Sequence, residues 1–224
     1  MKQKFSDIQV TKLHKQFDEL QNIHGSKNLD SIYGAGCINN PEICFVFMNP
    51  TGKNVASNKE WKGLKAQWLG TKNIWKLLNS LNLIDEKIFN KTQNLRPEEW
   101  SYEFAYELYK DMDNKSIYIT NLGKCTQDDA RPLSNKVFYD YLELLEKEID
   151  LIKPKKIITF GNQVSSILLK ENISVSKCRK QSFTKTINKH EYKIYPVFYP
   201  VGQGMRNIPI AIEDIKYIIG EENV

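Results

Sequence analysis

Three segments of this chain place polar side chains at the end of a run of apolar residues. The run 43–48 leads into Asn49-Pro50-Thr51-Gly52, the run 116–121 ends at Asn121, and the run 193–199 ends at Tyr199. The carboxamide of Asn121 combines a hydrogen-bond donor and an acceptor, which matches the edge of a nucleobase. The alternative is an asparagine that caps an ordinary turn.

The loop after Tyr199 is a second candidate for ligand contact. It contains Gly202, Gly204 and Arg206 ahead of an expected helix. Glycines let the backbone approach a ligand closely, and an arginine before a helix start suits a substrate phosphate. A plain strand-to-helix connection is the alternative.

The segment 47–54 is superficially similar to a phosphate-binding loop but departs from its pattern. In GxxxxGK[ST], Phe47 takes the place of the first glycine and Asn54 that of the Ser or Thr. The chain also lacks a GxGxxG sequence. These departures argue against an NTPase.

Three tryptophans, Trp61, Trp68 and Trp75, are spaced by seven residues. A helical core stripe would explain the spacing, but Gly63 and Gly70 interrupt such a helix. We therefore expect Trp61 and Trp68 in a loop, where an aromatic ring can stack on a base. Buried packing of these rings remains the alternative.

The elements that must position these residues are strands alternating with helices. Strands are expected at 43–48, 116–121, 155–160 and 193–199, and each is almost entirely apolar. Such strands predict an α/β fold of three layers, α/β/α, around a central four-stranded, mainly parallel sheet. Right-handed crossovers bring the carboxyl ends of all four strands to one rim. Helices are expected at 7–23, 74–83, 98–112, 134–152, 162–170 and 208–219, with a loop at 84–98 and an irregular or hairpin segment at 171–192.

Length and composition suit one globular domain. The 224 residues are 41% hydrophobic and 26% charged, and we expect one domain over 1–224 with an N-terminal helical extension over 1–30. No apolar run approaches a membrane span, and the N-terminus lacks the apolar region of a signal peptide, so a cytoplasmic protein is expected. The cysteines form no CxxC pair and the histidines show no zinc spacing, which predicts reduced thiols and no metal site.

Positive charge is concentrated in two stretches. Residues 53–76 carry six lysines against one glutamate, and residues 177–193 carry six basic residues against one glutamate. Two basic stretches on a slightly acidic body suit a polyanion, with nucleic acid as the leading candidate. A solvated lysine-rich face is the alternative.

Taken together, these segments resemble the uracil-DNA glycosylase superfamily over residues 32–219. One version of its first motif is Met-Asn-Pro-Gly, and the chain reads Met48-Asn49-Pro50-Thr51-Gly52 with one residue inserted. The stretch 118–125, followed by Arg131-Pro132 and a long helix, is similar to the iron–sulfur branch. The closing motif of the superfamily is usually His-Pro-Ser, and here it is Tyr199-Pro200-Val201.

Two departures from the family pattern matter. Tyr199 replaces the histidine and Val201 the serine of the closing motif. Only Cys125 has a counterpart among the four cluster cysteines of the iron–sulfur branch, so we expect no iron–sulfur cluster, no metal and no other cofactor.

The resemblance implies a glycosylase that flips a deoxyuridine-like nucleotide out of the base stack into the rim pocket. Trp68 would stack on the base, Asn121 would bind its Watson–Crick edge and Asn49 would hold the attacking water. Tyr199 would replace the histidine that donates a hydrogen bond to the leaving base. An asparagine at the water position cannot act as a base, which predicts a slow enzyme.

Further contacts are implied by the same resemblance. DNA, single- or double-stranded, is the expected partner, with no membrane and no obligate protein partner. The remaining substrate-binding residues are Met48, Pro50, Gly52, Gly202 and Arg206. The residues expected on the DNA backbone are Lys53, Lys72, Lys124 and Arg131.

Two other functions remain open from the sequence. Loss of the histidine and serine favours a catalytically inactive nucleic-acid-binding member of the superfamily. The third reading is an enzyme on free nucleobases or nucleotides, for which the lysine-rich stretches would be unnecessary.

Overall fold

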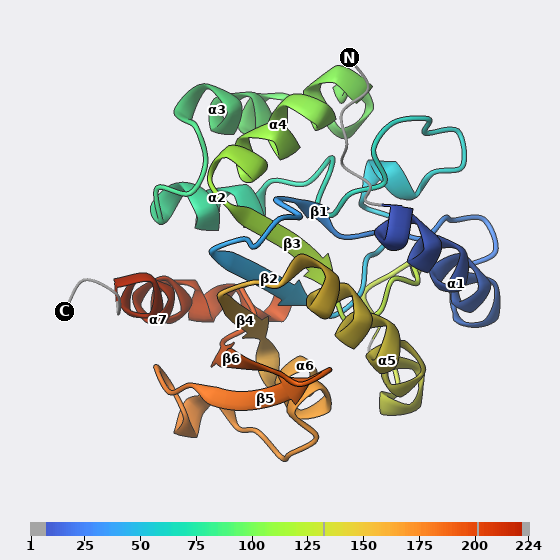
Figure 1. The fold of residues 1–224 in the computed structure, drawn as a ribbon. Helices are drawn as coiled ribbons and strands as arrows, with labels where there is room; N and C mark the ends of the chain where they lie inside the picture. The colour runs from blue at the N-terminus through green and yellow to red at the C-terminus, as the bar shows by residue number, and fades with distance from the viewer. Residues whose placement is uncertain (1–7, 132, 201, 221–224) are drawn as a thin grey trace.

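The centre of the structure, a computed structural model, is a sheet of four parallel strands (Figure 1). The structure describes residues 8–131, 133–200 and 202–220. The parallel strands are β3 (Ile117–Asn121), β2 (Ile43–Phe47), β4 (Lys156–Phe160) and β6 (His190–Val197), in that spatial order. Every residue of β2, β3 and β4 is buried, as expected of strands covered on both faces.

Two shorter antiparallel strands extend the sheet at its edges. β1 (Ala35–Gly36) pairs with β3, and β5 (Phe183–Ile187) pairs with β6 in a hairpin. The predicted α/β fold with a central, mainly parallel sheet is therefore confirmed, and six strands rather than four make up the described sheet.

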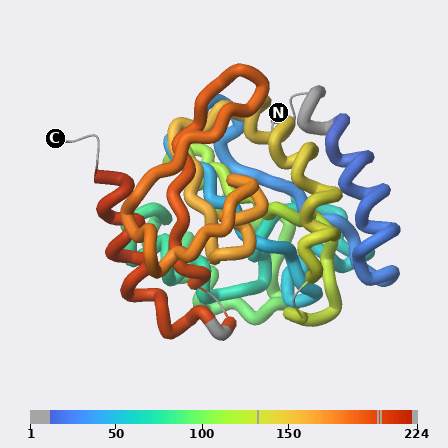
Figure 2. Tube along the Cα trace, turned by 90° about the horizontal axis from the view of Figure 1, so that it is seen from below, coloured from blue at the N-terminus to red at the C-terminus, as the bar shows by residue number. Residues whose placement is uncertain are grey.

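Helices cover both faces of the sheet. One face packs against α2 (Asn73–Ser80), α4 (Tyr102–Asn114) and α7 (Ile208–Gly220). The other packs against α5 (Asn135–Ile152) and α6 (Gly161–Leu169). Helix α1 (Ile8–His24) lies alongside α5, outside the second layer (Figures 1 and 2).

The loop expected at 84–98 is wrong, because α3 (Glu86–Asn94) occupies most of it. Asp85 caps this helix by accepting hydrogen bonds from the backbone N–H groups of Lys87 and Ile88. Few apolar residues mark its buried side, so helical periodicity is weak there. Four 3-10 helices complete the described chain: η1 (Val55–Ser57), η2 (Pro97–Glu99), η3 (Val175–Lys177) and η4 (Gly202–Asn207).

The carboxyl ends of the parallel strands meet at one rim, and the strand register fixes which residues adjoin there. Phe47 lies beside Asn121, and Phe160 beside Val197. The ladder continues past the strands, because Leu122 donates to the Phe47 carbonyl and Gly123 to the Met48 carbonyl, both at 2.8 Å. The loops after β2 and β3 are thereby held together.

Candidate active site

An open cavity of about 1040 Å³ occupies this rim. Its walls come from the loop after β2, the segment 67–74, the start of α6, and the loop after β6. Most of the predicted site residues line it, namely Met48, Asn49, Pro50, Gly52, Lys53, Trp68, Lys72, Arg131, Tyr199 and Gly202. Asn121, Lys124 and Arg206 do not, and Pro132 and Val201 of the family motifs lie outside the described residues.

Asn49 lies in the cavity wall, in a loop that backbone hydrogen bonds hold in place. Gly52 donates to the carbonyl of Gln127 at 2.8 Å, and Gln127 donates back to the Pro50 carbonyl at 3.2 Å. The Asn49 Nδ2 donates to the Pro50 carbonyl at 3.1 Å. This contact leaves the side-chain Oδ1 as the acceptor that Asn49 can offer to a water molecule.

Asn121 is 1% exposed, and neither its Nδ2 nor its Oδ1 has a hydrogen-bond partner among the described residues. Strand alternation directs its side chain to the same face as Ile117 and Ile119. On that face its neighbour in the register is Phe47, whose ring contacts Trp68 and Tyr199. A buried carboxamide without partners lowers the stability of the fold by about 1–3 kcal/mol. Folding therefore does not explain why this group lies behind the cavity wall, whereas ligand binding would.

Trp68 lies in a loop, as predicted, and takes an unusual backbone conformation. Its φ is +62°, in the left-handed region that a bulky residue rarely adopts. Three contacts to its carbonyl hold the turn: Trp75 Nε1 at 3.2 Å, Thr71 Oγ1 at 2.7 Å and Thr71 N at 3.2 Å. The ring meets Phe47 edge-on, with centroids 5.0 Å apart, and lines the cavity. Such strain in a cavity wall is typical of a ligand-binding position.

Tyr199 is half-buried and packs edge-on against Phe47, with centroids 6.3 Å apart. Burial raises the pKa of Tyr199 above the ordinary tyrosine value, so its hydroxyl stays a neutral donor. Two glycines make room for it. A Cβ at Gly204 would lie 1.9 Å from the Tyr199 carbonyl oxygen, and Gly161 has φ +86° with its Cβ position 3.5 Å from Tyr199 Cβ.

Gln67 is a candidate that the sequence analysis missed. It lines the cavity next to Trp68, is 1% exposed, and its Nε2 has no hydrogen-bond partner among the described residues. Tyr109 holds its backbone by donating to the Gln67 carbonyl at 2.7 Å. Its position before a candidate stacking residue was the one sequence signal that could have drawn attention to it.

Four cations lie at or near the mouth of the cavity. Lys53, Lys72 and Arg131 line it, and all three are exposed. Arg206 is exposed on the adjoining η4 but lies outside the cavity wall. Arg131 is paired with Asp129 at 2.8 Å, so Lys53, Lys72 and Arg206 supply the positive charge that suits a phosphate backbone.

Lys124 does not belong to this group, and the prediction that it contacts the DNA backbone is wrong. Its side chain is fully buried, and its Nζ lies 2.7 Å from Glu148 Oε2 of α5. Because the ammonium is enclosed and paired inside the protein, it has no access to a phosphate.

Much of the charge of the second basic stretch is neutralised. Arg179 pairs with Asp214 at 2.8 Å and with Glu213 at 3.1 Å. Lys185 pairs with Glu146 at 2.8 Å. The hairpin turn at 188–189 precedes β6, so it lies at the end of the sheet opposite the rim. The described wall of the candidate site contains Lys53 and Lys72 of the first stretch and no basic residue of the second.

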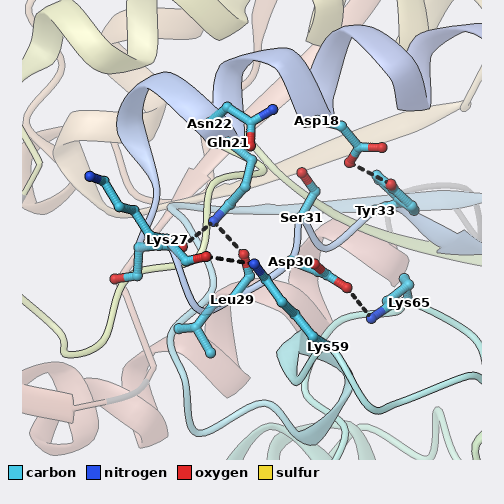
Figure 3. A pocket seen from close by; sticks show the side chains of 11 residues that line it. Asp18, Gln21, Asn22, Lys27, Leu29, Asp30, Ser31, Tyr33, Lys59 and Lys65 are labelled. Carbon is cyan, nitrogen blue, oxygen red and sulfur yellow. Dashed lines mark hydrogen bonds and ion pairs between the residues drawn. The ribbon is translucent and has the colours of Figure 1, made fainter.

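A second cavity, of about 380 Å³, lies between α1 and the loops that follow η1 (Figure 3). Its charged groups are largely paired with one another. Lys65 Nζ donates to the Asp30 carboxylate at 2.7 Å, and the Tyr33 hydroxyl donates to Asp18 at 2.6 Å.

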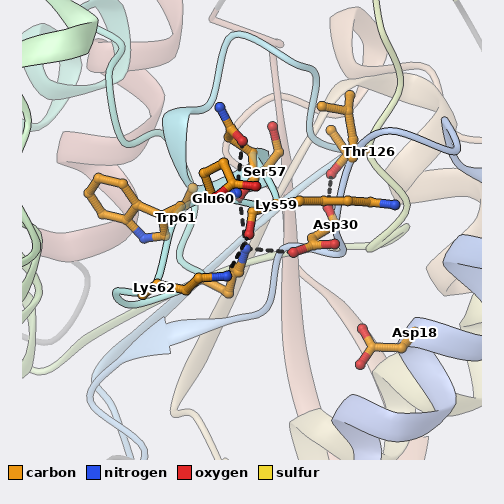
Figure 4. Close-up of polar contacts among 12 residues, drawn as sticks. Asp18, Asp30, Ser57, Lys59, Glu60, Trp61, Lys62 and Thr126 are labelled. Carbon is orange, nitrogen blue, oxygen red and sulfur yellow. Dashed lines mark hydrogen bonds and ion pairs between the residues drawn. The ribbon is translucent and has the colours of Figure 1, made fainter.

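Neighbouring polar contacts tie the same region together (Figure 4). Thr126 Oγ1 donates to the Asp30 carbonyl at 2.7 Å, and Lys62 Nζ donates to the Lys59 carbonyl at 3.1 Å. We interpret this cavity as part of the junction between α1 and the loops, because its groups already satisfy one another.

The cysteines do not fit a four-thiolate cluster. Cys125 packs with Phe17 and Tyr141 in an apolar cluster, and burial raises the pKa values of the Cys44, Cys125 and Cys178 thiols, which disfavours the thiolate that binds metal. Over 8–131, 133–200 and 202–220, no three His, Cys, Asp or Glu side chains gather as a metal site requires. In the same ranges, no helix is both long and apolar enough to cross a membrane.

Comparison with known proteins agrees with this geometry. The chain is 28% identical over 103 residues to a type-4 uracil-DNA glycosylase of Saccharolobus solfataricus, which covers 44% of this chain and 47% of the relative. It is 26% identical over 93 residues to a type-4 uracil-DNA glycosylase of Sulfurisphaera tokodaii, which covers 40% and 42%. These matches span less than half the length of either relative. The family model described as the uracil DNA glycosylase superfamily matches residues 33–207, which include the whole rim, and the chain belongs to this superfamily.

Proposed function

We propose that the protein is a DNA glycosylase that hydrolyses the N-glycosidic bond of uracil, or of a related damaged base, in single- or double-stranded DNA. The observation that carries the proposal is the unpartnered carboxamide of Asn121, buried beside a cavity that Asn49, Trp68 and Tyr199 line. A cytoplasmic location and a single domain over 1–224 are parts of the same proposal.

Base recognition follows from the chemistry of the carboxamide. Uracil presents an N3–H donor and an O4 acceptor, and Asn121 offers Oδ1 and Nδ2 to this pair. Cytosine presents an acceptor and a donor at the same places, so the same orientation of the amide rejects it. Trp68 supplies the face on which the flipped base stacks, and the Gln67 Nε2 is available for a further base acceptor.

Hydrolysis requires a water molecule at the sugar and a stabilised leaving base. Water oxygen attacks C1′ while the bond from C1′ to the base nitrogen breaks, and the bonding electron pair stays on the base. The water releases its proton to solvent. Asn49 Oδ1 orients this water, and the Tyr199 hydroxyl donates a hydrogen bond to the O2 of the departing base, where negative charge develops.

One assay tests this function. The protein is incubated with oligonucleotides that carry uracil, hydroxymethyluracil, hypoxanthine or a mismatched thymine, in single and double strands, and abasic sites are then cleaved with alkali. We expect strand breaks at uracil and none at cytosine. The absence of breaks with every lesion, at protein concentrations that saturate the DNA, would refute the proposal.

We expect Tyr199→Phe to lower the excision rate by about 10²-fold, because one donor to a developing anion is worth about 10²–10³ in kcat. DNA affinity should stay unchanged, since the ring packing on Phe47 is kept. Single-turnover excision and DNA binding measure the two effects, with the exposed Tyr139→Phe as control.

The pH profile gives a second check on Tyr199. Burial raises its pKa, so its donor form persists, and no histidine in the closing motif titrates. We expect Tyr199 to add no alkaline loss of rate below about pH 10, and no acid limb near pH 6.5. A wild-type rate in Tyr199→Phe would remove Tyr199 from the mechanism.

The cations at the cavity mouth should set the salt dependence of binding. Each phosphate contact contributes about 0.7–0.9 to the slope of log affinity against log salt. The variant with Lys53→Gln and Lys72→Gln should lose about 1.4–1.8 of this slope. A matched variant with Lys189→Gln and Lys193→Gln, both exposed at the end of the sheet opposite the rim, should keep it. Equal slopes in the two variants would contradict the proposed DNA path.

A catalytically inactive DNA-binding protein is the second candidate, and the tyrosine in the closing motif is the observation that favours it. Such a protein would bind uracil-containing DNA with the same salt dependence and leave no abasic sites. The excision assay separates the two functions.

A further inference from the structure

A buried polar network lies directly behind Asn121, on the opposite face of β3. The Lys124 Nζ donates to the Thr120 Oγ1 at 2.6 Å, to the Glu148 Oε2 at 2.7 Å, and to the backbone carbonyl of Asn121. An ammonium has three N–H donors, so these acceptors satisfy all of them. Lys124 and Glu148 are 0% and 1% exposed.

The other end of the network is fixed as firmly. The Tyr118 hydroxyl donates to Glu148 Oε1 at 2.7 Å, and the Thr120 hydroxyl lies 3.0 Å from the same oxygen. Gly34 packs directly against this carboxylate, so closely that a Cβ at Gly34 would lie 2.4 Å from Glu148 Oε1. Helix α5, strand β3 and the loop after β3 are thus joined through one carboxylate.

Strand alternation explains why the network and the cavity meet at one residue. Tyr118 and Thr120 point toward α5, whereas the Asn121 side chain points to the opposite face, toward Phe47. Lys124 therefore holds the backbone of Asn121 from one side while the carboxamide faces the cavity side. The loop held by Lys124 also bears on Asn49, because the Cβ position of Gly123 lies 3.6 Å from Asn49 Cβ.

Stability alone is a weak reason for such a pair. Desolvation of two charges offsets most of their attraction, and well-packed apolar residues often replace a buried ion pair without loss of stability. An apolar replacement would not hold the backbone carbonyl of Asn121, at the end of β3, in a fixed position.

We propose that the buried Lys124–Glu148 pair is a positioning device, which sets the Asn121 carboxamide and the adjacent Asn49 loop for reading and excising the base. Neither residue touches the substrate. The pair acts through the Asn121 carbonyl and the turn 121–124. This inference rests on the proposed function.

The test is the double variant with Lys124→Met and Glu148→Met, which removes both charges and keeps apolar volume. We expect a folded protein with a lower thermal midpoint, because the buried Tyr118 and Thr120 hydroxyls lose their acceptor, together with a single-turnover excision rate at least tenfold lower and a lower preference for uracil over cytosine. DNA affinity should not change, because the network lies away from the DNA-facing cations. A double variant with wild-type rate and wild-type preference would overturn the proposal.

The control is Glu143→Gln with Lys147→Gln, an exposed pair on the same helix, which should excise as the wild type does. If the double methionine variant does not fold, Tyr118→Phe removes only one hydrogen bond to Glu148 and should lower the rate about threefold. An unchanged rate in Tyr118→Phe would then overturn the proposal.

A readout without catalysis separates this inference from the proposed function. The side-chain amide resonance of Asn121 should be sharp in the wild type and broadened or averaged in the double variant. No excision by the wild type would refute the glycosylase, whereas an unchanged Asn121 resonance in the variant would refute the positioning role.

Discussion

Replacement of Asn121 by Leu is expected to stabilise the protein and to abolish its recognition of uracil. Leucine matches asparagine in the number and branching of its side-chain heavy atoms, although it is larger, and the buried carboxamide has no partner among the described residues. Removing this unsatisfied group should raise the free energy of unfolding by about 1–2 kcal/mol. For a chain of this size, the thermal midpoint should then rise by roughly 2–8 °C.

The same substitution removes both hydrogen bonds to the base. Two such bonds are worth about 3 kcal/mol together, so the excision rate should fall by about 100-fold or more. Thermal unfolding and single-turnover excision measure the two opposite effects. Thr159→Val is the matched control, because its buried hydroxyl is paired with Ser165 at 2.8 Å and lies on β4. It should lower stability and leave excision intact.

A loss of stability in Asn121→Leu beyond the roughly 1–3 kcal/mol that overpacking can cost would contradict this account of the site. It would mean that the carboxamide is satisfied in the free protein, and its place behind the cavity would then be explained by folding alone.

Asn49→Ala is expected to lower the single-turnover rate by about 10²-fold with little change in DNA affinity. The reason is that Asn49 Oδ1 orients the attacking water, and a misplaced nucleophile costs about that much. Its Nδ2 makes one hydrogen bond, to the Pro50 carbonyl beside it, so the loop should keep its shape. A rise in dissociation constant without loss of rate would place Asn49 in binding instead.

The companion variant Asn49→Asp should act in the opposite direction. A carboxylate can accept the proton of the water, which a carboxamide cannot, so the rate near neutral pH should rise by about tenfold or more. The gain should disappear as the pH falls through the carboxylate range, near pH 4. An Asp variant as slow as the Ala variant would show that proton acceptance does not limit the reaction.

The core of the fold could be predicted because its strands are continuous apolar runs. β2, β3 and β4 are five-residue strands that are buried throughout, and an uninterrupted apolar run bounded by turn residues predicts such a strand. β1 was not predicted, because its two residues, Ala35 and Gly36, are too few to show a strand pattern. The site residues after the strands followed from topology, since parallel strands end at one rim.

The errors share a physical cause, which is a partner distant in sequence. Lys124 was expected at the surface, as lysines usually are, and only the carboxylate of Glu148 24 positions later explains its burial. Gln67 was overlooked because an unpaired amide in a loop has no sequence pattern. The second basic stretch was counted as free charge, although acids of α5 and α7 pair with it.

This uneven neutralisation has a consequence for how the protein meets its target. Lys53, Lys72 and Arg206 at the cavity mouth remain exposed, whereas Arg179, Lys180 and Lys185 of the second basic stretch are bound to acids. The exposed positive charge at the rim therefore attracts a polyanion before contact. Productive encounters with DNA should be more frequent than random orientation allows, and this kinetic advantage should shrink as salt shortens the reach of the field.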